Sequence, residues 1–171
     1  MLNVFVNTWG NYNENGAEGG QWITLPMEPE ELAEVLENIA KLMEDNDPEW
    51  VIHDYEWLSE VEPGDIDEMD PIEYWNELCL EICELQEWEA EEIAAAMEAF
   101  DYSFTEALER QQQGRFVFYN GMDLEEVAEE LILECYNLPE LALRYFDYNA
   151  FARDLSFDGY TDTRYGVIVR C

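Results

Sequence analysis

The spacing of hydrophobic and polar residues predicts a mixed α+β chain. Alternation over residues 2–7 predicts a strand, and apolar residues three or four apart after Pro29 predict a helix with Leu32, Leu36, Ile39 and Leu42 on its inner face. Further strands are predicted at 21–25, 50–55, 115–119 and 166–170. Further helices are predicted within 71–100 and at 103–113, 124–132, 138–145 and 147–155, and a Gly- and Asn-rich loop at 7–20.

These elements group into three small modules. Residues 1–62 form an antiparallel sheet with one helix, and the break at Pro63-Gly64 separates them from an acidic helical module at 63–103. Residues 104–171 form a C-terminal α+β module. No internal repeat or low-complexity linker divides the chain further.

Composition excludes several classes of protein. The chain of 171 residues carries 42 acidic and seven basic residues, a net charge of −35. A direct nucleic-acid binder must present cations to phosphates, and an anionic membrane attracts basic proteins, so neither is expected as a partner. Hydrophobic residues make up 48% of the chain, which is far more than an acidic disordered tail contains. The sequence therefore predicts a folded protein that tolerates strong self-repulsion.

The negative charge is concentrated in one part of the chain. Residues 28–109 hold 29 acidic residues and a single base, Lys41, whereas residues 111–171 hold 11 acids and five arginines. In the middle module, acidic residues recur at helical spacing and continue beyond residue 84 if the helix runs on. A row of carboxylates a few ångströms apart can stand in for a row of phosphates. We therefore predict an anionic binding surface made of Asp65, Asp67, Asp70, Glu73, Glu77, Glu81, Glu84, Glu87 and Glu91.

Two simpler interpretations compete with a functional acidic surface. A run of charges is usually only a solvated helix face, but the absence of lysine over most of this region argues against it. Adaptation to high salt also favours acidic surfaces, but it predicts acidic residues spread evenly along the chain. The nearly balanced C-terminal module does not fit that expectation.

The candidate chemistry for catalysis or metal binding is weak. His53 is the only histidine, so a relay that needs several imidazoles cannot be built. Cys79 and Cys83 have helical spacing and are expected to be buried structural thiols rather than zinc ligands. The segment from Asp65 to Asp70 begins like a calcium loop but lacks its glycine and its final glutamate. We expect no enzyme activity, no cofactor and no metal site, and we expect the tryptophans to pack in cores and between modules.

The cysteines and the N-terminal residues favour a cytoplasmic location. Four cysteines without a disulfide-like spacing fit a reducing compartment. The first residues lack the basic segment and the long apolar run of a signal peptide, and no stretch is long and apolar enough to span a membrane.

Three stretches of the chain resemble the ArdA family of antirestriction proteins. The first runs from Asn11-Tyr-Asn13 through Gly20-Gln-Trp-Ile-Thr-Leu-Pro26, and the second is Ile52-His-Asp-Tyr-Glu56. The third and most specific overlies the family's antirestriction motif and ends in Gly166-Val-Ile-Val. Its residues are Leu138, Pro139, Glu140, Tyr145, Phe146, Asp147, Tyr148, Phe151, Arg153, Asp154 and Leu155.

The resemblance implies a function and partners. ArdA proteins are cytoplasmic products of plasmids and conjugative transposons. They are elongated, curved dimers with three small domains per chain. They imitate bent B-form DNA and occupy the DNA-binding site of Type I restriction–modification enzymes, on the methyltransferase core. The family dimerises through its C-terminal domain, so the motif residues are expected at the homodimer interface, although their helical spacing fits a plain core equally well.

Other functions remain compatible with the sequence. An acidic DNA mimic could be aimed at another DNA-binding protein, such as a nucleoid protein or a repressor. An acidic chaperone or scaffold would bind basic proteins promiscuously and would need no defined curvature.

Overall fold

The structure is a computed structural model that describes residues 1–59 and 61–171. It divides into two compact units, Met1–Leu85 and Gln86–Cys171. Each unit combines a small antiparallel sheet with helices, which confirms the predicted α+β class. The finer division into modules 1–62, 63–103 and 104–171 stays a prediction.

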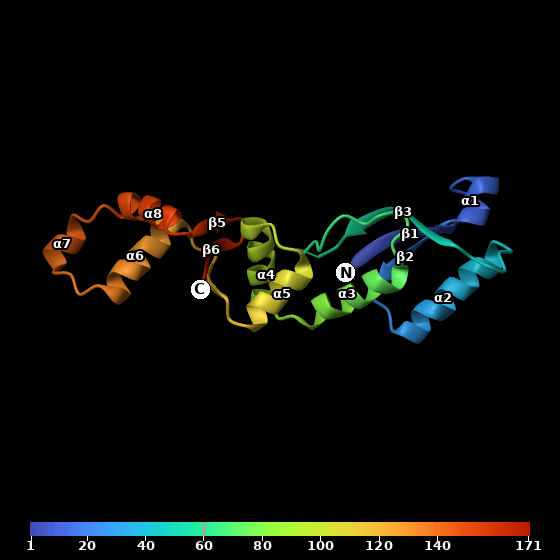
Figure 1. Cartoon of the computed structure of the whole chain (residues 1–171), viewed down its shortest axis with the longest axis horizontal. Coiled ribbons are helices and arrows are strands. Elements are labelled where there is room, and N and C mark those ends of the chain that lie inside the picture. The colour runs from blue at the N-terminus through green and yellow to red at the C-terminus, as the bar shows by residue number, and fades with distance from the viewer. Residues whose placement is uncertain (60) are drawn as a thin grey trace. The chain divides into compact units, whose positions relative to one another are not determined.

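The first unit is built on a three-stranded sheet. Its strands are β1 (Leu2–Thr8), β2 (Gln21–Leu25) and β3 (Trp50–Trp57), in the order β2-β1-β3. Leu2, Val4 and Val6 alternate along β1 and are fully buried, so one face of the central strand belongs to the core. Figure 1 shows the helices α2 (Pro29–Leu42) and α3 (Ile72–Glu84) on one side of this sheet.

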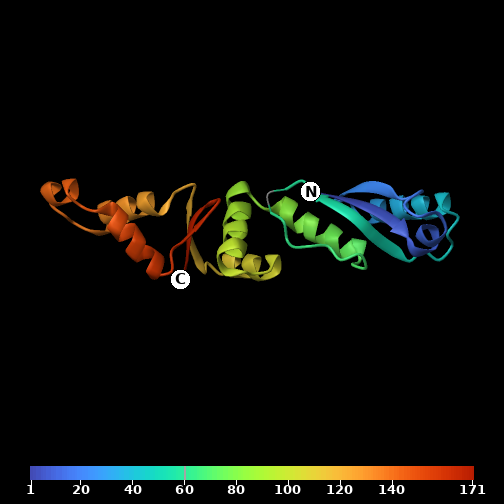
Figure 2. The ribbon, with the colours of Figure 1, turned by 90° about the horizontal axis from the view of Figure 1, so that it is seen from above.

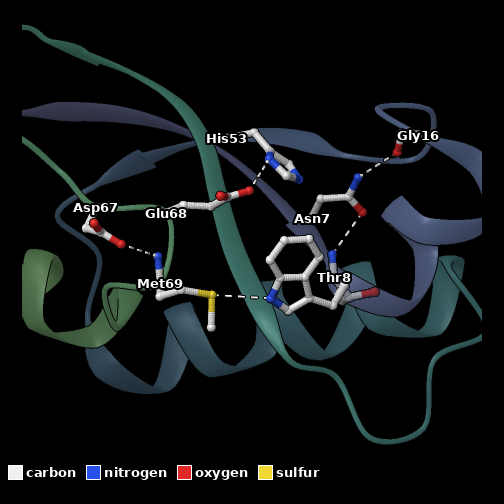
Figure 3. Close-up of polar contacts among 8 residues, drawn as sticks. Asn7, Thr8, Gly16, His53, Asp67, Glu68 and Met69 are labelled. Carbon is white, nitrogen blue, oxygen red and sulfur yellow. Dashed lines mark hydrogen bonds and ion pairs between the residues drawn. The ribbon is translucent and has the colours of Figure 1, made fainter.

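The predicted loop at 7–20 contains a short helix, α1 (Trp9–Asn15). Its ends are satisfied by side chains: the Thr8 hydroxyl accepts from the Asn11 N–H at 3.2 Å. The side-chain nitrogen of Asn7 donates to the carbonyl of Gly16 at 3.1 Å. The side-chain oxygen of Asn7 accepts from the Thr8 N–H at 2.8 Å (Figure 3). Gly and Asn have low helix propensity, and buried amide side chains compensate for it here. Asn11, which falls within the loop predicted at 7–20, is buried in this network.

The predicted helical stretch of 71–100 is two helices. Helix α3 ends at Glu84, Leu85 is extended with ψ at 144°, and α4 (Glu87–Phe100) begins afresh. The Glu89 carboxylate accepts the N–H of Gln86 at 2.8 Å and so caps the start of α4. The break carries no glycine or proline, which is why the pattern of the sequence did not reveal it.

The second unit has helices on both faces of its sheet. The strands are β4 (Phe116–Asn120), β5 (Thr161–Thr163) and β6 (Gly166–Arg170), in the order β4-β6-β5. Val167 and Ile168 are both fully buried although neighbouring residues of a strand face opposite ways, so both faces are covered. Val167 packs in a cluster with Val127, Ala128 and Leu155. The helices are α4, α5 (Phe104–Gln112), α6 (Leu124–Cys135), α7 (Glu140–Arg144) and α8 (Tyr148–Phe157), and Figure 2 shows them from above.

Two predicted helix starts are confirmed by their caps. The Ser103 hydroxyl accepts from the N–H of Glu106 at 3.3 Å, and the Asp123 carboxylate accepts from the N–H of Glu125 and of Glu126 at 2.9 Å. Strand β5 was not predicted, because three residues are too few for alternation to show.

Several residues that were predicted to be buried are exposed in the structure. Leu42 is 73% exposed, because the helix ends there and Ala40 takes the core position. Cys79 is buried as predicted, but Cys83 is exposed. Trp22 and Trp88 are also exposed, so these two tryptophans are not core residues of their units.

One buried amide fixes helix α3 to the rest of the first unit. Asn76 is 3% exposed, and its side-chain oxygen accepts from the Met27 N–H at 2.8 Å. Its side-chain nitrogen donates to the Met27 carbonyl, also at 2.8 Å. The amide thus pairs with the backbone between β2 and α2 as a neighbouring strand would, and it sets the position of α3.

We predict that Asn76→Leu destabilises the protein by about 2 kcal/mol, because it leaves two partly buried backbone groups without partners. Denaturant unfolding of the full chain measures the change. Asn38→Leu, at an exposed position of α2, is the control and should change the stability by about 0.5 kcal/mol or less. If Asn76→Leu is as stable as the unchanged protein, the two hydrogen bonds of Asn76 contribute nothing to the stability of the fold.

Candidate acidic interaction surface

Helix α3 presents four carboxylates on one face. Glu73, Glu77, Glu81 and Glu84 are all exposed. At about 100° per residue they fall within an arc of about 80°, over a rise of about 16 Å. The buried residues Trp75, Leu78 and Ile82 lie on the opposite side of the helix. The amphipathic pattern therefore fixes the direction of the acidic row, and the core behind it keeps the row in place.

The charges of this row are not neutralised within the protein. None of the four carboxylates makes a side-chain hydrogen bond or an ion pair with another described residue. The first unit contains 23 acidic residues and one lysine, Lys41, and Lys41 pairs with Glu37 on α2 at 2.6 Å. The row therefore keeps its full negative charge for an external partner.

The acidic segment from Asp65 to Asp70 is attached to the sheet by neutral groups. The Tyr55 hydroxyl donates to the Asp65 carboxylate at 3.2 Å, and the Trp75 indole N–H donates to the Asp70 carboxylate at 3.2 Å. The backbone N–H of Ile52 donates to the Glu68 carbonyl at 3.0 Å. These contacts anchor the segment at both of its ends, on β3 and on α3.

Backbone N–H groups also orient two carboxylates of this segment. The Asp67 carboxylate accepts from the Met69 N–H at 3.1 Å, and the Asp67 N–H donates to Asp70 at 2.9 Å. The Trp9 indole N–H donates to the Met69 sulfur at 3.2 Å. A neutral donor restrains a carboxylate without cancelling its charge, whereas an ion pair would do both.

The lone histidine also lies against this segment. His53 Nδ1 is 3.1 Å from the Glu68 carboxylate, and the ring packs on Tyr12 with centroids 4.3 Å apart. Its Nε2 atom is buried and has no hydrogen-bond partner among the described residues. The imidazole thus helps to fix the acidic segment on β3.

Two residues of the predicted surface, Glu87 and Glu91, lie beyond the break between α3 and α4. Glu87 and Glu91 belong to α4 in the second unit, so they do not continue the helix face of Glu84. Glu87 is exposed, but Glu91 is half-buried and accepts a hydrogen bond from the Asn120 side chain. The structure places Glu73, Glu77, Glu81 and Glu84 on one face of α3, and the segment from Asp65 to Asp70 directly before that helix in the first unit.

Burial raises the pKa of two carboxyl groups in the second unit. Desolvation raises the pKa of Glu92, and a hydrogen bond from Gln111 opposes the shift. Desolvation and the nearby Asp123 raise the pKa of Asp162. Neither residue belongs to the predicted acidic surface.

The predicted motif residues lie in and around α7 and α8. Leu155 is buried in the core of the second unit, and Phe146 packs edge-on against Phe151 with centroids 5.9 Å apart. Tyr145 is 78% exposed. The Asp147 carboxylate caps α8 by accepting from the Ala150 N–H at 3.0 Å. The remaining members are half-buried (Leu138, Tyr148) or exposed (Pro139, Glu140, Arg153, Asp154).

This part of the second unit also exposes apolar side chains. Leu133, Tyr136, Leu141 and Tyr145 are each more than half exposed, and they lie at the end of α6 and around α7. The motif thus combines core residues with side chains that are open to a partner.

Sequence reasoning missed the groups that hold the acidic surface in place. Tyr55 and Trp75 donate to its carboxylates, and Asn76 positions its helix. The tryptophans were predicted only as packing residues. Their positions within the acidic region were a visible signal, because a buried indole usually finds an acceptor for its N–H.

Among the described residues, no group of three or more His, Cys, Asp or Glu side chains has an arrangement that could hold a metal ion. Within the same residues, none of the helices has the length and apolar character needed to cross a membrane.

Comparison with known proteins identifies the family. The family model described as antirestriction protein (ArdA) matches residues 4–169, nearly the whole chain. No curated protein gives a significant match. The matched region includes the acidic row on α3, the segment beside it and the motif around α7 and α8. The chain therefore belongs to the ArdA family of antirestriction proteins.

Proposed function

We propose that this antirestriction protein acts as a DNA mimic and occupies the DNA-binding site of a Type I restriction–modification enzyme, on its methyltransferase core. The observation that carries the proposal is the row of four uncompensated carboxylates on α3, supported by Asp65, Asp67 and Asp70 beside it. These groups take the place of DNA phosphates in a groove lined by basic residues.

The spacing of the row supports this role. Four charges over about 16 Å of helix give a density of the same order as one DNA strand, which carries one phosphate per about 3.4 Å of axis. The acidic segment from Asp65 to Asp70, which precedes α3, adds further negative charge to the first unit. A basic groove therefore meets a comparable field on the protein.

Restraint of the carboxylates supports tight binding. A DNA-binding groove gains much of its affinity by neutralising phosphates and releasing their counterions. Carboxylates already held by Tyr55, Trp75 and backbone N–H groups lose little freedom on binding. No base is read in this mode, so inhibition is independent of the enzyme's recognition sequence.

The C-terminal motif acts through self-association. The exposed side chains of Leu133, Tyr136, Leu141 and Tyr145 supply the apolar area that a homodimer interface needs. The second unit carries six of the seven basic residues, so its self-repulsion on pairing is lower than that of the first unit. The dimer presents two acidic surfaces that together imitate bent B-form DNA in the cytoplasm.

Replacing Glu73, Glu77, Glu81 and Glu84 together by Gln should weaken inhibition about tenfold or more, because four charge contacts of modest individual strength are lost at once. Glu81→Gln alone should change inhibition by less than about threefold, since the remaining carboxylates still fill the groove. DNA cleavage by a Type I enzyme, measured against inhibitor concentration, gives both values.

The control changes the same charge elsewhere in the first unit. Glu14, Glu18, Glu44 and Glu49 are exposed, lie outside the predicted surface and make no side-chain hydrogen bond with a described residue. Their joint replacement by Gln should leave most of the inhibition intact. Equal losses in both quadruple variants would mean that only total charge matters, and a large loss from Glu81→Gln alone would contradict a redundant surface.

Arg153→Ala should weaken the dimer and inhibition in parallel. Arg153 is exposed on α8 and has no ion pair with a described residue, so its loss leaves the fold intact. Analytical ultracentrifugation measures the dimer, and raising the variant's concentration should restore inhibition. A variant that remains fully dimeric and fully inhibitory would remove Arg153 from the interface.

A further inference from the structure

Three of the six arginines converge on one hollow of the second unit. The hollow has a volume of about 340 Å³. Arg110 from α5, Arg115 from the residue before β4, and Arg170 from the end of β6 line it, together with Phe116. This concentration is unexpected in a chain with 42 acidic residues, where an arginine at almost any position could have a carboxylate partner.

Aromatic rings hold two of these guanidinium groups. Arg170 lies over the Phe100 ring, 4.1 Å from its centroid, and Arg110 lies over the Tyr102 ring at 4.5 Å. Phe100 in turn stacks on Phe116 with centroids 5.8 Å apart. A cation on an aromatic face is fixed in position but keeps its charge and its N–H donors.

Only one of the three arginines is neutralised. Arg110 donates to the Glu106 carboxylate from Nε at 3.2 Å and from Nη2 at 2.8 Å. Arg115 and Arg170 make no ion pair with any described carboxylate, although Glu109 also lines the hollow. Backbone pairing keeps the two close together, because the N–H of Cys171, next to Arg170, donates to the Arg115 carbonyl at 2.9 Å.

We propose that this hollow binds a phosphoryl oxyanion, as free phosphate or as the phosphate of a nucleotide. Two guanidinium groups with free N–H donors match the several oxygens of a phosphate better than the two oxygens of one carboxylate. The volume exceeds that of one phosphate ion and leaves room for part of an attached group beside Phe116. Of the two glutamates that line the hollow, Glu106 is already paired with Arg110, which leaves Glu109 as the lining carboxylate that opposes an anion. Charges farther away than about 8 Å are screened at physiological salt.

This site is separate from the acidic surface, and its existence does not depend on the proposed function. The residues that form it belong to α5, β4 and β6, whereas the row of carboxylates belongs to α3 in the first unit. A protein that repels nucleic acid overall thus holds a local site for a small anion.

The test is an NMR titration of the full chain with inorganic phosphate, at constant ionic strength maintained with chloride. We expect saturable shifts of the side-chain Nε–H signals of Arg115 and Arg170. Arg115→Gln should weaken binding at least tenfold, and Arg115→Lys should restore part of it. Arg115 is exposed and its side chain supports no other residue, so these variants keep the fold.

Arg144→Gln is the matched control, because it removes the same charge from an exposed arginine on α7 and should leave phosphate binding unchanged. Adenosine monophosphate in place of phosphate distinguishes the sources: binding at least tenfold tighter than phosphate indicates a nucleotide, and equal binding indicates free phosphate. The absence of saturable shifts, unchanged affinity in Arg115→Gln, or equally strong binding of acetate would each overturn the proposal.

Discussion

The fold of the first unit has to hold 23 acidic residues together with a single lysine. One lysine cannot form ion pairs with so many carboxylates. The carboxylates that are held in a defined position therefore accept hydrogen bonds from neutral donors instead. The hydroxyl of Tyr55, the indole of Trp75 and backbone N–H groups hold the segment from Asp65 to Asp70. The amide of Asn76 holds the helix that carries the acidic row. A protein surface can resemble a row of phosphates only if its carboxylates are held in position and also keep their charge.

In the second unit, by contrast, arginines neutralise part of the acidic charge. Arg110 and Arg164 pair with Glu106 and Glu98, while Arg170 rests on aromatic rings. The lower net charge of this unit suits self-association, and its exposed apolar side chains gather near the motif. The division of charge between the units thus parallels the division of tasks that we propose, in which the first unit binds a basic partner and the second binds another copy and a small anion.

Much of this architecture could be predicted from the sequence, for identifiable reasons. The β2 strand and the caps at Ser103 and Asp123 follow from strong local signals, and all are confirmed. Helix α1 could not be predicted, because the side chains of Asn7 and Asn11 hold it by hydrogen bonds to the carbonyls of Gly16 and Glu18, which helix propensity does not capture. The break before α4 has no breaker residue, and its capping glutamate sits among many others. The acidic row itself was visible as a period of three and four, but the donors that restrain the neighbouring segment from Asp65 to Asp70 depend on which strands and helices pack together.

The most direct test of the account is displacement of DNA. Labelled duplex DNA bound to the methyltransferase core of a Type I enzyme is challenged with the purified protein at low and at moderate salt. We predict displacement at near-stoichiometric amounts, regardless of recognition sequence, with a weaker effect at higher salt because the attraction is electrostatic. A folded dimer that leaves the DNA bound at both salt concentrations would contradict the account, and its acidic surface would then serve another basic partner.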